Sequence, residues 1–173
     1  MKTIATDIRL AEPDDAAALA EVHEAAWLNA YSGLIPNRSL HAMVQRRGPD
    51  WWRRALHRGA AILVFQFDGR VAGYATLGRN RAPALLVDGE IYELYLQPEF
   101  QGLGFGGRLF RAAGSVLTRK GLKGLAVWCL ADNERAMRFY AAIGGHDIAE
   151  GEECFEGTVL RKVGFIWPVD SRF

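Results

Sequence analysis

The sequence is poor in the residue types that mark several classes of protein. It has two cysteines, Cys129 and Cys154, among 173 residues, which is too few for a disulfide framework. No apolar run approaches the length of a membrane span, and the N-terminal residues lack the apolar stretch of a signal peptide. The four histidines are scattered without the spacing of metal ligands, so we expect no metal site.

The chain also lacks an excess of charge of either sign. Its 21 Lys and Arg residues against 20 Asp and Glu residues leave a net charge of +1, which gives no argument for binding nucleic acid or an anionic membrane surface. A chain of 173 residues, half of them apolar, is long enough to enclose one hydrophobic core. No repeat or linker interrupts it, so we expect residues 1–173 to form a single domain of a soluble, cytoplasmic protein.

Segments with strand and helix patterns follow one another along the chain. Short apolar runs predict seven strands, at residues 4–10, 60–67, 70–77, 90–96, 124–131, 146–151 and 154–166. Helical spacing predicts helices starting near 13, within 39–58, over 107–120, and from 132 or 133 to a stop at Gly144. Strands and helices alternate strictly only in the second half of the chain. This favours an α/β (α+β mixed) fold with a mixed sheet of about seven strands flanked by helices.

The most informative segment is the glycine-rich run 101–106, Gln-Gly-Leu-Gly-Phe-Gly, between a predicted strand and a predicted helix. Glycines let backbone N–H groups approach a ligand closely, and the start of a helix adds unpaired N–H donors and a positive dipole end. This combination is typical of a phosphate or pyrophosphate site. The candidate residues are Gln101, Gly102, Leu103, Gly104, Phe105, Gly106 and Gly107.

The same glycines also match a dinucleotide fingerprint. Gly102, Gly104 and Gly107 read G-x-G-x-x-G, which is the pattern of a Rossmann-type NAD-binding oxidoreductase. That pattern requires the strand to run directly into the first glycine, whereas residues 98–101 intervene here. It also requires more chain after the loop than this sequence has. We therefore keep this interpretation as the weaker alternative.

Two motifs in order make the chain resemble the GNAT family of N-acetyltransferases. The family's loop has the form Gln/Arg-x-x-Gly-x-Gly/Ala, which residues 101–106 fit. Residues 127–144 resemble its second motif, a strand followed by an Asn and a helix that carries Phe-Tyr and ends in Gly. The element order matches over essentially the full chain. The resemblance implies a bulged sheet and transfer of an acetyl group from acetyl-CoA to a primary amine, on a small molecule or a peptide.

The resemblance also assigns roles in holding acetyl-CoA. The glycine loop would bind the pyrophosphate. The backbone of Leu94 and Leu96 would pair with the pantetheine arm, beside a bulge that splays the strand. A backbone N–H near Leu94 or Tyr95 would donate to the acyl carbonyl oxygen as its charge develops. Asn133 would contact the arm. The candidates for the ribose phosphate are Arg108, Arg111 and Arg138.

Tyr140 is the predicted proton donor to the departing thiolate. It lies seven residues after Asn133, on the same face of one helix. Its alternative role is core packing behind Phe139, as for most aromatic helix stripes. Direct attack in a ternary complex is preferred over an acyl-enzyme, because no His or Lys near Cys129 in the sequence would activate its thiol.

The general base has two candidates on one strand, Glu90 and Glu93. Their odd separation places them on opposite faces unless a bulge intervenes. Without a bulge, Glu90 shares its face with Leu94 and Leu96, and its position resembles that of the base in several family members. A bulge between the two carboxylates would favour Glu93.

The acceptor site is the least specified part. His23, Trp27 and Tyr31 recur every four residues on the first helix and are candidates for lining it, with packing of that helix as the alternative. A non-catalytic acyl-CoA-binding or sensing protein is the competing function on the same scaffold. The resemblance allows a homodimer, for which the aromatic residues Trp51, Trp52 and Trp167 are the only hints.

Overall fold

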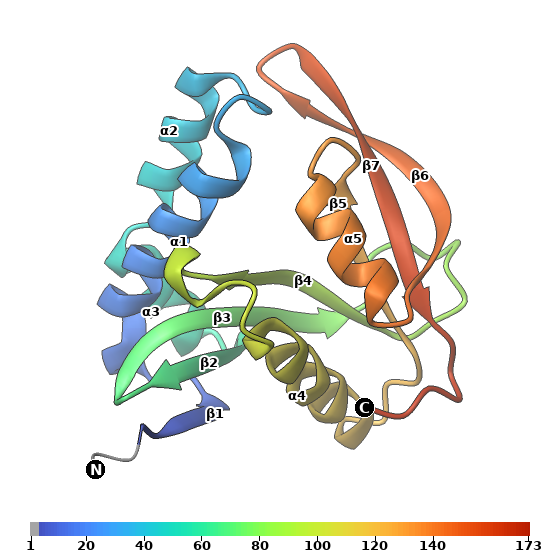
Figure 1. Ribbon diagram of the computed structural model, residues 1–173, viewed down its shortest axis with the longest axis horizontal. Coiled ribbons are helices and arrows are strands. Elements are labelled where there is room, and N and C mark those ends of the chain that lie inside the picture. Colours follow the sequence, from blue (N-terminus) through green and yellow to red (C-terminus); the bar gives the residue numbers. More distant parts are fainter. Residues whose placement is uncertain (1–3) are drawn as a thin grey trace.

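The computed structural model describes residues 4–173, and its single sheet has seven strands in the order β1-β2-β3-β4-β5-β7-β6 (Figure 1). The strands are β1 (Thr6–Leu10), β2 (Ala61–Phe67), β3 (Arg70–Arg79), β4 (Gly89–Leu96), β5 (Leu125–Leu130), β6 (His146–Phe155) and β7 (Thr158–Trp167). The helices are α1 (Ala16–Tyr31), α2 (Asn37–Arg46), α3 (Pro49–His57), α4 (Phe105–Arg119) and α5 (Glu134–Ala142). The predicted mixed α/β architecture is confirmed.

Strand directions decide against the dinucleotide alternative. β4 and β5 are parallel and are joined through α4, whereas the pairs β1–β2, β2–β3, β3–β4, β5–β7 and β6–β7 are all antiparallel. A Rossmann domain needs a largely parallel, doubly wound sheet. The Rossmann interpretation is therefore wrong.

Alternating side chains of the strands pack on two different helix layers. Leu63 and Phe65 of β2 belong to the core that contains α4 residues and Tyr140 of α5. Ile62 and Val64, their neighbours along the strand, pack with α1 and with Trp52 of α3. This alternation is the period-two pattern of a strand buried on both faces. The sheet therefore separates an α4–α5 side from an α1–α3 side.

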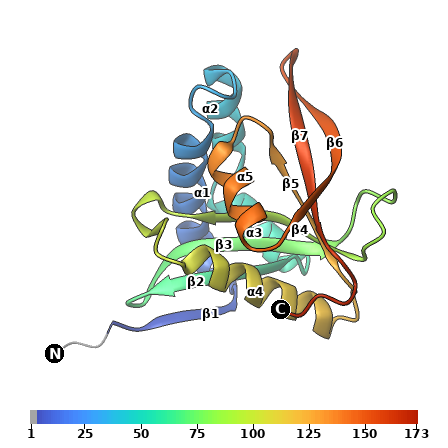
Figure 2. The same ribbon diagram turned by 45° about the vertical axis from the view of Figure 1, so that its right-hand side comes forward.

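A bulge and a splay shape the middle of the sheet. Across β3 and β4, Thr76 pairs with Glu93 but Leu77 pairs with Ile91, so Tyr92 is an extra residue on β4. β4 then pairs with β5 over only three residues, from Gly89 to Ile91. Beyond that point the strands part, and β5–β7 stand at a steep angle to β1–β4 (Figures 1 and 2).

Several local expectations need correction. Residues 39–58 form two helices, α2 and α3, because Pro49 starts α3 and disfavours helical geometry at the residue before it. β6 extends to Phe155, so Cys154 lies in β6 and not in the last strand. Trp52 and Trp167 are core residues, 0% and 4% exposed, and so they give no support to a dimer interface.

Within residues 4–173, none of the helices combines the length and the apolar character needed to cross a membrane.

Candidate active site

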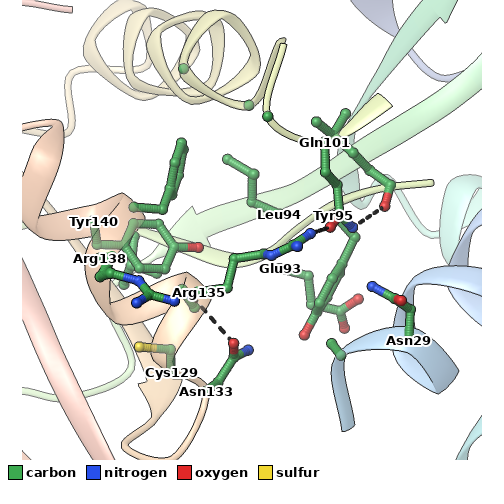
Figure 3. A pocket seen from close by; sticks show the side chains of 18 of the residues that line it. Asn29, Glu93, Leu94, Tyr95, Gln101, Cys129, Asn133, Arg135, Arg138 and Tyr140 are labelled. Atoms are coloured by element: carbon green, nitrogen blue, oxygen red, sulfur yellow. Dashed lines mark hydrogen bonds between the residues drawn. The ribbon is translucent and has the colours of Figure 1, made fainter. Parts of the chain in front are cut away.

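A cavity of about 860 Å³ lies where β4 and β5 part, and we call it the central cavity (Figure 3). Most of the residues expected to bind or process a ligand line it. They are Tyr31, Glu93, Leu94, Tyr95, Leu96, Gln101, Gly102, Gly104, Gly106, Gly107, Asn133 and Tyr140. Residues brought together from α1, β4, the glycine loop and α5 therefore surround one space.

The glycine loop presents its backbone to this cavity. Gly102 and Gly104 have φ of +76° and +83°, a left-handed conformation that favours glycine. Gly104 is the N-cap of α4, so the first-turn N–H groups of that helix remain available to an anion. Leu103 is 63% exposed, and the Phe105 ring packs 4.7 Å from that of Phe65.

Side chains of Gln101 and α5 complete this end of the cavity. The Gln101 amide donates to the carbonyl oxygen of Leu96 at 3.0 Å, which ties the loop to the end of β4. Arg135 lines the cavity and donates to the Gln101 side-chain oxygen. Arg138 also lines it, whereas the Arg108 guanidinium donates to the Thr6 hydroxyl at 2.9 Å. Sequence reasoning missed Arg135, although it lies two residues after the motif residue Asn133.

Tyr140 and Asn133 face the cavity from α5. The Asn133 side-chain oxygen accepts the Ala136 N–H at 3.2 Å and caps the helix. Tyr140 is 6% exposed, with its hydroxyl directed into the cavity (Figure 3). Burial raises the pKa of the Tyr140 phenol. At neutral pH this group therefore holds a proton that it can donate.

Cys129 also lines the central cavity, which the sequence did not indicate. Its thiol lies 3.6 Å from the Met137 sulfur, and burial raises its pKa to about 11. The thiolate is the nucleophilic form of cysteine. Cys129 is therefore a weak nucleophile at neutral pH, as expected of a buried strand cysteine.

The bulge at Tyr92 changes the comparison of the two carboxylates. With one extra residue between them, Glu90 and Glu93 share a face of β4, and Leu94 and Leu96 face the opposite, α4 side. The expectation that Glu90 shares a face with Leu94 and Leu96 is therefore wrong.

Glu90 lies away from the central cavity. It is 2% exposed and pairs with Arg81, accepting the backbone N–H at 2.8 Å and a guanidinium N–H at 2.7 Å. This contact anchors the loop between β3 and β4. Glu93 alone of the two carboxylates reaches the cavity.

Glu93 lies within a chain of side-chain hydrogen bonds that we call the Glu93 network, which runs from Arg47 through Glu93 and Tyr74 to His23. The Arg47 guanidinium donates to one carboxylate oxygen of Glu93 at 2.5 Å, and the Tyr74 hydroxyl donates to the other at 2.6 Å. Because the Tyr74 hydroxyl donates its only proton to Glu93, its oxygen acts as the acceptor for His23 Nδ1–H at 2.8 Å.

Burial fixes the protonation state of His23, the last residue of this network. Desolvation, with a smaller contribution from the charge of Arg47, lowers the pKa of His23 to about 3. The ring is therefore neutral at pH 7, with its proton on Nδ1. Its Nε2 is buried and has no hydrogen-bond partner among residues 4–173.

The structure separates the three aromatic candidates of the first helix. Tyr31 lines the cavity and shares a 2.5 Å hydrogen bond with the Tyr95 hydroxyl. His23 is completely buried, and the Trp27 ring lies between those of His23 and Tyr31, at centroid distances of 4.7 and 5.1 Å. His23 and Trp27 therefore do not line the cavity and instead pack behind Tyr31, which does.

Comparisons with known proteins agree with this geometry. The model of the acetyltransferase (GNAT) family matches residues 19–144. The uncharacterized N-acetyltransferase YuaI of Bacillus subtilis is 30% identical over 162 residues, which cover 93% of this chain and 92% of that protein. The thialysine N-epsilon-acetyltransferase of Bos taurus is 36% identical over 75 residues, 41% of this chain and 44% of that protein.

A solved structure shares the fold. The PaiA N-acetyltransferase of Thermoplasma acidophilum, in complex with coenzyme A, superposes with a TM-score of 0.72 at 16% identity, over 91% of this chain and 98% of that one. The family model and the YuaI match each span most of the sequence, and the solved structure has the same fold. This chain therefore belongs to the GNAT family of acetyltransferases.

Proposed function

We propose that the protein transfers the acetyl group of acetyl-CoA to the nitrogen of a primary amine, by direct attack while both substrates are bound. The observation that carries this proposal is the content of the central cavity. It holds backbone donors for a pyrophosphate, a buried phenol that keeps its proton, and a carboxylate, Glu93. The backbone donors would bind the cofactor, and the carboxylate and the phenol would serve as general base and general acid in forming an amide from a thioester.

The cavity offers groups for both the pyrophosphate and the pantetheine arm of coenzyme A. The N–H groups at the start of α4 suit the pyrophosphate, with Arg135 and Arg138 close enough to add positive charge. β4 beyond Ile91 has no β5 partner, so the backbone of Leu94–Leu96 can pair with the amides of the pantetheine arm as a strand edge does. The PaiA neighbour, which shares this fold, is in complex with coenzyme A, and this supports coenzyme A as the ligand.

Acetyl-CoA supplies an acetyl group activated as a thioester. Glu93 accepts the proton that the amine nitrogen loses as the new C–N bond forms. Backbone N–H near Leu94 or Tyr95 stabilises the negative charge on the carbonyl oxygen. Tyr140 gives its proton to the sulfur as the C–S bond breaks, and solvent afterwards reprotonates Tyr140 and removes the proton from Glu93. The weak nucleophilicity of Cys129 argues against an acyl-enzyme.

The proposal is tested first by binding and then by turnover. Calorimetric titrations with acetyl-CoA, coenzyme A and NAD should show saturable binding of the first two and none of NAD. A panel of primary amines should then release free thiol from acetyl-CoA. Binding without transfer to any amine would support an acyl-CoA-sensing protein instead, and binding of NAD alone would contradict the cofactor assignment.

Tyr140→Phe tests the proton donor directly. Removing the hydroxyl should lower the turnover number at least about tenfold, because a positioned general acid contributes on this scale or more. The dissociation constant for acetyl-CoA should stay within about twofold, since the ring remains. Full turnover in this variant would remove Tyr140 from the mechanism.

A further inference from the structure

Arg47 is held beside Glu93 on the α1–α3 side of the sheet. It follows α2 directly, and its guanidinium lies 4.3 Å from the centroid of the Trp51 ring. One N–H of this group donates to Glu93 at 2.5 Å. The Arg47 side chain is 26% exposed. The tryptophan and the carboxylate thus hold the cation in place while part of it stays accessible.

Most of the hydrogen-bonding capacity of Arg47 is unused. A guanidinium carries five N–H donors, and across the described part of the chain the Arg47 side chain makes one hydrogen bond, to Glu93. A planar guanidinium with free donors binds carboxylates through two parallel hydrogen bonds. The site therefore has an unfilled capacity for an anionic group next to the catalytic carboxylate.

The position of this pair suits the acceptor and not the cofactor. Glu93 and Tyr95 point to the α1–α3 side of β4, whereas Leu94 and Leu96 point to the α4 side, where the glycine loop lies. Glu93 nevertheless lines the central cavity. Arg47 is not among the lining residues and contacts Glu93 on the α1–α3 side. An amine that meets Glu93 in the cavity would therefore have the Arg47 guanidinium next to that carboxylate.

We propose that Arg47 and Glu93 form a subsite for acceptors that carry a carboxylate a few bonds from the reacting amine, as amino acids do. This inference rests on the proposed function and names its substrate class. The positive Arg47 is complementary to the carboxylate of an amino acid, and the negative Glu93 beside it is complementary to the amino group. The carboxylate of the acceptor accepts hydrogen bonds from the free donors of Arg47, and Arg47 then moves away from Glu93. The Glu93 oxygen that Arg47 has left accepts the amine proton. An amine without an acid leaves Arg47 on Glu93.

The test compares matched acceptors in the wild-type enzyme and in Arg47 variants. The panel contains the common L-amino acids, their carboxamides and the corresponding decarboxylated amines, with thiol release as the readout. In the wild type, the KM of the preferred amino acid should be at least about tenfold below that of its amide, the scale of one charged hydrogen bond. Arg47→Gln should remove this preference by raising the KM of the acid about tenfold relative to the KM of the amide. Arg47→Lys should keep part of the preference.

Arg53→Gln is the matched control. Arg53 lies on α3 in an exposed ion pair with Asp50, so its loss should leave both KM values unchanged. Acetyl-CoA affinity, measured by calorimetry, should be the same in all variants and shows that they are folded. Equal use of acids and amides by the wild type, or an equal KM change for both in Arg47→Gln, would overturn the subsite while amine acetylation stands. Absence of transfer to every compound would count against the proposed function itself.

Discussion

The two sides of the central cavity are built by different means. On the α4 side, the groups offered to a ligand are mostly backbone N–H donors from a continuous run, Gln101–Gly107, set by the left-handed conformations of Gly102 and Gly104. On the α1–α3 side, the Glu93 side chain lines the cavity, and side chains from three other parts of the chain hold it in the Glu93 network. Chemistry on the first side depends on backbone conformation, and chemistry on the second depends on side-chain identity. Substitutions on the two sides should therefore affect different steps.

The largest effect is expected at Glu93. Glu93→Gln keeps the size of the side chain and removes the carboxylate, so the turnover number should fall about a hundredfold or more, the usual contribution of a positioned base. Acetyl-CoA affinity should hardly change, because Glu93 faces away from α4. Steady-state kinetics and calorimetry measure the two quantities.

Glu90→Gln is the control for that change. Glu90 anchors Arg81 outside the cavity, so its loss should lower the free energy of unfolding while the turnover number of the folded enzyme is retained. A large loss of turnover in Glu90→Gln, with Glu93→Gln active, would return the base to Glu90.

The reverse pattern is expected on the α4 side. Gly104→Val forces a β-branched residue to a φ of +83°, at a cost of about 1–3 kcal/mol, and distorts the start of α4. The dissociation constant for coenzyme A should rise about tenfold. Gly59→Val is a matched control, since Gly59 has a φ of +81° and lies after α3. Equal binding loss in both variants would show that general strain, and not the loop, is responsible.

Tyr74→Phe breaks the network while leaving Glu93 in place. Tyr74 is completely buried, and without its hydroxyl both a Glu93 oxygen and His23 Nδ1 lose a partner. The free energy of unfolding should drop by about 1–3 kcal/mol, as for other buried unsatisfied groups. Tyr92→Phe removes a hydroxyl that donates to the Arg79 carbonyl in an exposed setting and should cost less. Urea denaturation of both variants compares them, and equal losses would mean that the buried hydroxyl adds nothing.

The last prediction concerns the stability of the folded protein in acid. Because burial holds the pKa of His23 near 3 in the folded protein, against about 6.5 when unfolded, the unfolded chain takes up a proton first as the pH falls. Stability is therefore complete above pH 6.5 and declines toward pH 3, by up to about 1.4 kcal/mol per pH unit. His23→Gln should flatten this slope between pH 6 and 4, whereas replacing the exposed His41 should not. An unchanged slope in His23→Gln would mean that other groups set the acid sensitivity.

The contrast between the two sides also explains what the sequence could predict. The glycine loop and the Asn133–Tyr140 motif lie on short continuous segments, so local patterns were enough to identify residues that line one cavity. The choice between Glu90 and Glu93 depended on the single extra residue Tyr92, and only the pairing of β3 with β4 reveals it.

Arg47 was missed for a related reason. It sits at the break between α2 and α3, in a stretch that the sequence predicted as one helix, and nothing nearby distinguishes it from other surface arginines. Its role depends on contact with Glu93, 46 positions away. The fold class was predictable because hydrophobic periodicity and turn residues act locally, as at the Asp68-Gly69 hairpin between β2 and β3.

Under the proposed function, the early parting of β4 from β5 makes the melting temperature of this protein depend on the concentration of its substrate. From Tyr92 to Leu96 one edge of β4 has no strand beside it. Under the proposed function, a pantetheine arm bound there behaves as an additional strand that only the folded state can hold. At a hundred times its dissociation constant, such a ligand adds about 2.7 kcal/mol to the free energy of unfolding. The thermal resistance of the sheet then rises and falls with the concentration of a metabolite.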